Sequence, residues 1–180
     1  EGRYHLSIFF QDARFIADKT YLQLYRSKMV DGVIIWGLSD SDDYIREMEG
    51  LPFVAINSKP EGLTNFNYVG CDDTEAFRRI TGLALRKNRK KFVFVGNNDC
   101  CSIVRERFDG FLTALREYDL EPVAVLNSGL LAADGISALE KLAADRIEFD
   151  ALAAVNAGIG EAIMLNLPRF NWRVPEHFSF

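Results

Sequence analysis

The sequence predicts an α/β fold in which parallel β-sheets are built from βαβ units. Short runs of apolar, β-branched and aromatic residues alternate with segments whose apolar residues recur every three or four positions. The clearest case begins with the strand-like run Phe-Val-Phe-Val at 92–95, continues through turn-forming residues at 96–99, and then has a helical period up to Leu115. Strands that alternate with helices usually pair in parallel, so helices should cover the sheets.

Boundary residues support each element in the first half of the chain. Asp31-Gly32 and Pro52 mark the starts of two apolar runs, and Asp72 and Asp73 are suited to cap a helix. Asn88 stands where a helix ends and tolerates the left-handed conformation found there. We expect strands at residues 4–10, 32–37, 52–57 and 68–71, of which the strand at 32–37 is buried, and helices at residues 20–29, in a short stretch ending at 48, and at 75–86.

The second half repeats the alternation. Residues 92–95 are apolar without interruption, which is typical of a fully buried strand. The helix at 159–167 carries more apolar residues than one buried stripe requires. A strand at each end of the chain, without its expected neighbours, suggests a fragment. We expect strands at 92–95, 122–126 and 149–155, helices at 102–115, 132–144 and 159–167, and a last strand beginning at Phe178.

Composition limits the possible functions. The 180 residues could form one domain or two small lobes, and the 48% hydrophobic and 26% charged content is ordinary for a globular protein. The net charge of −5 argues against a nucleic-acid surface within this stretch. No apolar run approaches the ~20 residues that cross a bilayer. Three cysteines without metal-ligand spacing favour free thiols in a cytoplasmic protein with no metal and no cofactor.

Two arginines stand near the start of the predicted helix at 102–115. A helix dipole disfavours a cation in its first turns by ~0.3–1 kcal/mol, so Arg105 and Arg107 require another reason for their position. The carboxyl ends of parallel strands are where open α/β sheets bind ligands. Residues two apart on a helix differ by ~200°, so only one arginine can face a ligand. Gly110 allows this helix to approach a neighbouring backbone closely.

Six sequence motifs occur in a recognisable order. They lie at residues 29–35 (MVDGVII), 68–73 (YVGCDD), 90–96 (KKFVFVG), 105–111 (RERFDGF), 149–156 (FDALAAVN) and 174–180 (VPEHFSF). Together they resemble the effector-binding core of the lactose/galactose repressor family of bacterial transcriptional regulators. Asn88 departs from the family pattern, which usually has glycine there.

The resemblance implies two α/β lobes with parallel sheets, similar to type I periplasmic binding proteins, and a ligand cleft between them. We expect residues 1–97 to form the N-terminal lobe without its first βα unit, and residues 98–180 to form the C-terminal lobe without its last strands. The chain would cross between lobes near residues 97–101. The resemblance also implies a homodimer, no membrane association, and DNA binding through a helix-turn-helix segment outside this chain.

By resemblance, Arg107 is the arginine that meets the effector; the alternative is a surface ion pair. Asn156 and Asp73 would hydrogen-bond the ligand, but each could instead cap a helix. Trp36 could stack on a sugar ring or serve as a core aromatic. Two further positions depart from the family: Ala157 replaces an aspartate, and Leu131 replaces an aromatic residue, which leaves the ligand class open.

Three functions are compatible with these patterns. The first is a cytoplasmic, non-enzymatic ligand-sensing core of a transcriptional regulator whose effector is a sugar or related metabolite. The second is an extracytoplasmic sugar-binding protein of a transporter, which would carry a secretory signal. The third is a nucleotide-dependent enzyme, supported only by Gly158-Ile159-Gly160, because Ile163 occupies the third glycine position of a dinucleotide motif.

Overall fold

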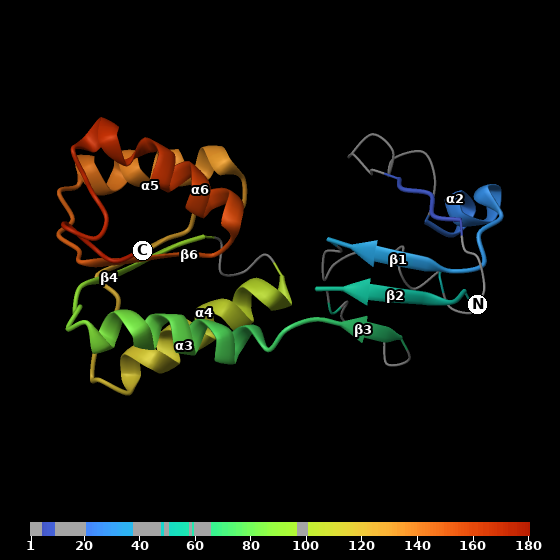
Figure 1. The fold of residues 1–180 in the computed structure, drawn as a ribbon, viewed down its shortest axis with the longest axis horizontal. Helices are drawn as coiled ribbons and strands as arrows, with labels where there is room; N and C mark the ends of the chain where they lie inside the picture. The colour runs from blue at the N-terminus through green and yellow to red at the C-terminus, as the bar shows by residue number, and fades with distance from the viewer. Residues whose placement is uncertain are drawn as a thin grey trace. The chain divides into compact units, whose positions relative to one another are not determined.

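A computed structural model describes residues 5–9, 21–37, 48, 51–57, 59, 66–96 and 101–180 (Figure 1). By its internal contacts the chain divides into two compact units, Glu1–Val69 and Gly70–Phe180. This division differs from the lobe boundary expected after residue 97, because strand β4 (Phe92–Val95) pairs with the strands of the second unit. The expected crossing at 97–100 and the short helix before Met48 lie outside the described residues.

The first unit contains a parallel three-stranded sheet in the order β1-β2-β3. Helix α2 packs with this sheet in a small core of buried residues, which includes Leu24, Ile35 and Phe53. This confirms the predicted helix and the parallel pairing. The elements are α2 (Tyr21–Lys28), β1 (Val33–Trp36), β2 (Phe53–Ile56) and β3 (Asn67–Val69).

Two expectations for the first unit are wrong. Residues 5–9 form no strand, and Leu6 and Ile8 are exposed. A strand needs a neighbour for its backbone groups, and none of the described residues pairs with this run. Strand β1 is not fully buried either, because Ile34 and Trp36 are exposed while Ile35 is buried. An apolar run alone does not show whether one or both faces of a strand are covered.

The second unit is a three-layer α/β arrangement. Its parallel sheet has the order β5-β4-β6, with α3 and α4 on one face and α5 and α6 on the other (Figure 1). The predicted α/β class with parallel sheets is thereby confirmed. The elements are α3 (Asp73–Arg86), β4 (Phe92–Val95), α4 (Ser102–Arg116), β5 (Ala124–Leu126), α5 (Ala132–Ala144), β6 (Ala151–Ala154), α6 (Ala157–Asn166) and the 3-10 helix η2 (Leu167–Phe170).

Strand β4 is the centre of this unit's core. All four of its residues are buried, as an uninterrupted apolar run predicts for a central strand. The Phe94 ring lies 4.9 Å from the ring of Phe108 and 5.2 Å from that of Phe111, centroid to centroid, which ties β4 to α4. Burying a phenylalanine contributes about 1.5–3 kcal/mol, so this aromatic cluster is a main source of stability.

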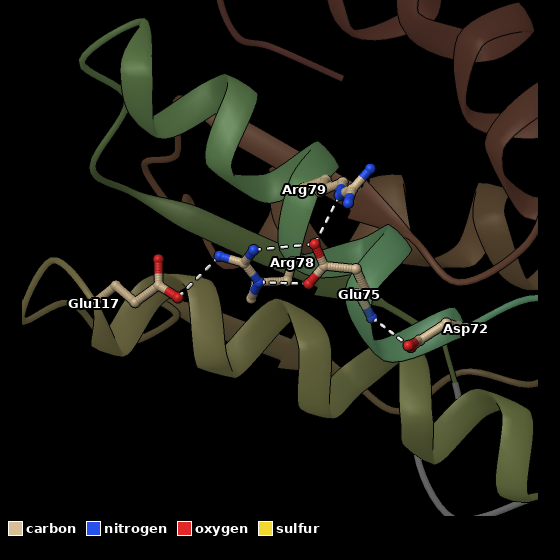
Figure 2. Close-up of polar contacts among 5 residues, drawn as sticks. All are labelled: Asp72, Glu75, Arg78, Arg79 and Glu117. Atoms are coloured by element: carbon tan, nitrogen blue, oxygen red, sulfur yellow. Dashed lines mark hydrogen bonds and ion pairs between the residues drawn. The ribbon is translucent and has the colours of Figure 1, made fainter.

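Helices α3 and α4 approach each other closely. A Cβ atom at Gly110 would lie 2.1 Å from the backbone oxygen of Thr74, which confirms the close approach expected at this glycine. Figure 2 shows the polar contacts nearby: both Arg78 and Arg79 bind the carboxylate of Glu75, and Arg78 Nη1 also reaches Glu117 Oε1 at 3.1 Å. Glu117 is the C-cap of α4, so this network joins the two helices.

The capping residues predicted from the sequence lie at the two ends of α3. Asp72 is the N-cap, and its Oδ1 accepts a hydrogen bond from the Glu75 amide at 2.9 Å (Figure 2). Asn88, one residue beyond the C-cap, has a φ of 61°, the left-handed conformation that asparagine tolerates. The two ends of α3 are therefore set by local signals.

The outer edge of β6 carries the beginning of a further strand. Ser179 forms a parallel bridge with Ala151, and its carbonyl accepts a hydrogen bond from the Leu152 amide at 2.9 Å. The Arg89 guanidinium group binds Ser179 Oγ and the Pro175 carbonyl oxygen, which holds this segment against the sheet. The strand expected to begin near Phe178 is thus present as a single bridge.

Candidate functional site

Most of the predicted site residues lie near the carboxyl edge of the β5-β4-β6 sheet. Because the three strands are parallel, their carboxyl ends share one edge, and α4 and α6 begin there. Arg107 lies in the second turn of α4, and Asn156 lies two residues after the end of β6, at the N-cap of α6. Asp73 begins α3 in the same unit.

Arg107 is held by two residues that are distant from it in sequence. Its Nε donates to Asp73 Oδ1 at 2.8 Å, and its Nη1 donates to the Val155 carbonyl oxygen at 2.8 Å. Its guanidinium carbon lies 5.8 Å from the centre of the Phe77 ring, within the range of a cation–π contact. These contacts fix the guanidinium plane without any ligand.

Asp73 is the buried partner in this ion pair. Its side chain is 7% exposed and that of Arg107 is 21% exposed, so water screens the pair only weakly. Within the described residues, Asp73 Oδ2 has no hydrogen-bond partner. The capping alternative belongs to Asp72, whose side chain accepts the capping hydrogen bond. The structure therefore joins two of the predicted site residues, Arg107 and Asp73.

Asn156 adopts the capping role that the sequence left open. Its Oδ1 accepts a hydrogen bond from the Ile159 amide at 2.8 Å at the start of α6, and its Nδ2 donates to the Leu130 carbonyl oxygen at 3.0 Å. It is nevertheless one of the residues along the groove described next. Its contact with a ligand stays a prediction.

A groove with a volume of about 600 Å³ runs along β6. Helices α3 and α6 contribute its walls, and most of its side chains are apolar. Arg107 and Lys87 are the two charged residues among the described residues that line it. The lining includes Phe77, Arg107, Val155, Asn156, Gly160 and Phe180. Polar donors at one part of an apolar groove suit a small organic ligand.

Three positions named in the sequence analysis remain: Trp36, a predicted binding residue, and Leu131 and Ala157, where the sequence departs from the family. Trp36, the last residue of β1 in the first unit, is 80% exposed, so it is no core aromatic. Leu131 is exposed at the N-cap of α5, and Ala157 is the first residue of α6. Neither can replace the hydrogen bonds or ring contacts of the family's usual residues.

Two contributors to the site were not predicted from the sequence. Phe77 stands four residues after Asp73 on α3, so helical spacing places both on one face, and this signal was available. The Val155 carbonyl group is a backbone acceptor and has no sequence signal. It becomes a partner of Arg107 only because β6 lies beside β4.

The described residues contain no group of three or more His, Cys, Asp or Glu side chains placed to hold a metal ion. Among the same residues, no helix has the length and apolar character needed to cross a membrane.

Residues 10–177 match the family described as periplasmic binding proteins and sugar binding domain of LacI family. This match spans most of the chain, and the chain belongs to that family. The resemblance to the lactose/galactose repressors is thereby confirmed. No curated protein matches the sequence.

The solved structures with similar folds include several transcriptional regulators. The Cra transcriptional dual regulator of Pseudomonas putida, in complex with fructose 1-phosphate, has 23% identity and a TM-score of 0.74 over 88% of this chain and 60% of its own. A LacI family regulator of Enterococcus faecium with bound ribose has 23% identity and a TM-score of 0.74 over 90% and 61%. One from Mycobacterium smegmatis has 24% identity and a TM-score of 0.73 over 87% and 59%. The chain thus spans less than two thirds of each.

Proposed function

We propose that this chain is the ligand-sensing core of a cytoplasmic transcriptional regulator. Its effector would be a sugar or related metabolite, and binding would control a helix-turn-helix segment outside this chain. Family membership and the regulators of similar fold support this proposal. The observation that carries it is Arg107, fixed at the carboxyl edge of a parallel sheet and facing a groove, where a ligand with several oxygens can be bound.

The predicted binding residues have separate proposed roles. Arg107 would donate hydrogen bonds to ligand oxygens, and Asn156 would offer its amide at the same edge. Trp36, exposed at the end of β1, would provide an aromatic face for a sugar ring. Asp73, the ion-pair partner of Arg107, would also hydrogen-bond the ligand.

A transport protein is the second candidate, because the family description includes periplasmic binding proteins. The regulators among the solved structures favour the first candidate. No specific observation favours a nucleotide-dependent enzyme.

Titration calorimetry with ribose and fructose 1-phosphate tests the proposal. Replacing Arg107 by alanine should weaken the affinity for a bound sugar by roughly tenfold to over a hundredfold, because hydrogen bonds to a charged group contribute ~1.5–3 kcal/mol. Thermal melting of each variant establishes that it is folded.

Arg105→Ala is the matched control, since it removes the same side chain two residues earlier on α4. It should change the affinity much less. Loss of binding in Arg105→Ala with binding retained in Arg107→Ala would contradict the assigned site. If no hydroxylated compound binds the wild-type protein, the proposal of a sugar effector fails.

A further inference from the structure

A cavity of about 390 Å³ lies at the amino ends of β4 and β6. Lys91 comes directly before β4, and residues 148–150 come directly before β6, and all of them line this cavity. Each of these strands has four residues and spans ~13 Å, so the cavity is well separated from the carboxyl edge where Arg107 is held. It is therefore distinct from the candidate site described above.

Aromatic side chains form the apolar part of the cavity. Phe149, Trp172 and Phe178 line it. The centroid of the Trp172 ring lies 5.3 Å from that of Phe149, with the ring planes at 90°, and 5.3 Å from that of Phe170, with the planes at 26°. Phe178 is fully buried, whereas Phe149 and Trp172 are only partly buried. Packing thus fixes these rings and leaves part of their surface open to the ring of a ligand.

Side chains of opposite charge stand beside each other at this cavity. Lys91 Nζ donates a hydrogen bond to Glu148 Oε2 at 2.5 Å, and the two side chains are 51% and 81% exposed. This hydrogen bond raises the pKa of Lys91 and lowers the pKa of Glu148, so both groups are charged at neutral pH. An ammonium group has three donors and a carboxylate has two acceptor oxygens, so two N–H groups of Lys91 and Oε1 of Glu148 lie outside this contact.

Two further polar residues line the cavity. The carboxylate of Asp150 accepts hydrogen bonds from the backbone amides of Lys90 and Lys91, at 3.0 and 2.8 Å from Oδ1. His177 Nδ1 accepts a hydrogen bond from the Arg173 amide at 2.9 Å, so the proton of the neutral imidazole is on Nε2, which is then a donor. The cavity thus combines an aromatic wall with donors, an acceptor and charges of both signs.

We propose that this cavity binds a free aromatic amino acid in its zwitterionic form. The ligand ring packs against Trp172 and Phe149, the ligand carboxylate accepts hydrogen bonds from Lys91, and the ligand ammonium group donates to Glu148. This site is separate from the proposed effector site, and the inference does not rest on the proposed function.

The charges at the cavity select this class of ligand over simpler aromatic compounds. A zwitterion places each of its charges beside an opposite charge of the Lys91–Glu148 pair. An aromatic anion meets Lys91 but also approaches the carboxylates of Glu148 and Asp150, and like charges repel. An aromatic cation gains from Glu148 but approaches Lys91. A compound without a ring leaves the aromatic wall exposed to water.

The two tryptophans of the chain make the proposal testable by NMR, because each indole gives its own Nε1–Hε1 signal. The experiment uses the 180-residue protein and L-phenylalanine as the probe, and the signal of Trp172 is assigned through its disappearance in Trp172→Phe. L-phenylalanine should shift this signal with a Kd on the order of 1 mM, as few and exposed contacts allow. The signal of Trp36, which is not among the residues that line the cavity, should stay unchanged.

Three related compounds test each part of the ligand on the unmodified protein. 3-Phenylpropanoate lacks the ammonium group, phenethylamine lacks the carboxylate, and L-alanine lacks the ring. Each should bind at least about fivefold more weakly than L-phenylalanine, which is the upper range for one exposed ion pair.

Two variants assign the charged contacts. Glu148→Gln should weaken the binding of L-phenylalanine by about fivefold but should not weaken that of 3-phenylpropanoate, which has no ammonium group. Lys91→Gln should weaken the binding of L-phenylalanine to a similar extent but should not weaken that of phenethylamine. Lys90→Gln is the matched control, because the Lys90 side chain is exposed beside Lys91 and does not line the cavity. It should bind all four compounds as the wild-type protein does.

Three results would overturn the inference. These are an unchanged Trp172 signal at about 10 mM L-phenylalanine, affinity for 3-phenylpropanoate or phenethylamine equal to that for L-phenylalanine, or equal losses in folded Lys90→Gln and Lys91→Gln. Melting curves identify any variant that does not fold, and the first two results are obtained on the wild-type protein alone. All these measurements are made without sugar, so their outcome is independent of the sugar titrations.

Discussion

Arg107 occupies a position that is unfavourable within its own helix and favourable within the folded unit. In the first turn of a helix the dipole opposes a cation by ~0.3–1 kcal/mol, and a weaker opposition reaches Arg107 in the second turn of α4. The carboxylate of Asp73 and the carbonyl group of Val155, each 2.8 Å away, offset that cost. A residue placed against its local field and held by distant partners is a candidate for function.

Glu75 provides a prediction at the same scale. Hydrogen bonds from Arg78 and then from Arg79 lower its pKa from 4.5 to about 2 (Figure 2). A carboxylate whose folded-state pKa is depressed stabilises the protein above its unfolded pKa, and this contribution is lost as the pH falls from about 4.5 to about 2. Glu75→Gln should therefore lower the melting temperature at neutral pH, and the difference from wild type should vanish near pH 2.

Glu121→Gln is a control for this effect. Glu121 is exposed before β5, and the described residues provide no ion pair for it. Its replacement should leave the melting temperature nearly unchanged between pH 2 and pH 7. Calorimetric melting across that range measures both variants. A constant difference between Glu75→Gln and wild type at every pH would contradict the assigned ion pairs.

At the scale of elements, the close contact between α3 and α4 depends on the absence of a side chain at Gly110. An alanine Cβ at Gly110 would lie 2.1 Å from the Thr74 backbone oxygen, so the helices would have to separate. We expect Gly110→Ala to lower the free energy of unfolding by about 1–3 kcal/mol, as overpacking does. Because α3 carries Asp73 and α4 carries Arg107, the same variant should also weaken ligand binding.

Gly82 on α3 offers the matched control. A Cβ there would meet only the end of the Arg86 side chain, at 3.5 Å. Gly82→Ala should therefore stabilise the protein by about 0.5–1 kcal/mol, because alanine favours the helix. Urea unfolding measures both variants. Equal effects in Gly110→Ala and Gly82→Ala would show that the close approach is not essential.

At the scale of the whole molecule, we propose that two copies associate through α6. Ile163 and Leu167 are buried within the unit, but Met164 and Leu165 are 43% and 73% exposed. Sedimentation of the wild-type protein at micromolar concentration should show a dimer. Leu165→Glu should yield monomers, because it places a charge in an apolar contact.

Val123→Glu adds the same charge at another exposed apolar position, before β5, and should leave the dimer intact. A monomeric wild-type protein at these concentrations would rule out the proposal. A dimer that Leu165→Glu does not affect would exclude α6 as its interface.

The sequence by itself determined the elements whose signals are local. The continuous apolar run of β4, the caps of α3 at Asp72 and Asn88, and the period of α4 all depend on neighbours in sequence, and the structure contains each of them. The motif order also determined the family. The choice of Arg107 over Arg105 followed from helix rotation together with that resemblance, and its role in binding stays a prediction.

Only the tertiary structure decided what depends on pairing across the chain. Strand β4 joins β5 and β6 and so belongs to the second unit, and residues 5–9 remain unpaired among the described residues despite an apolar composition. The partners of Arg107 come from 34 and 48 residues away. Such contacts arise because strands and helices distant in sequence share one core, and no local pattern of residues encodes which of them will meet.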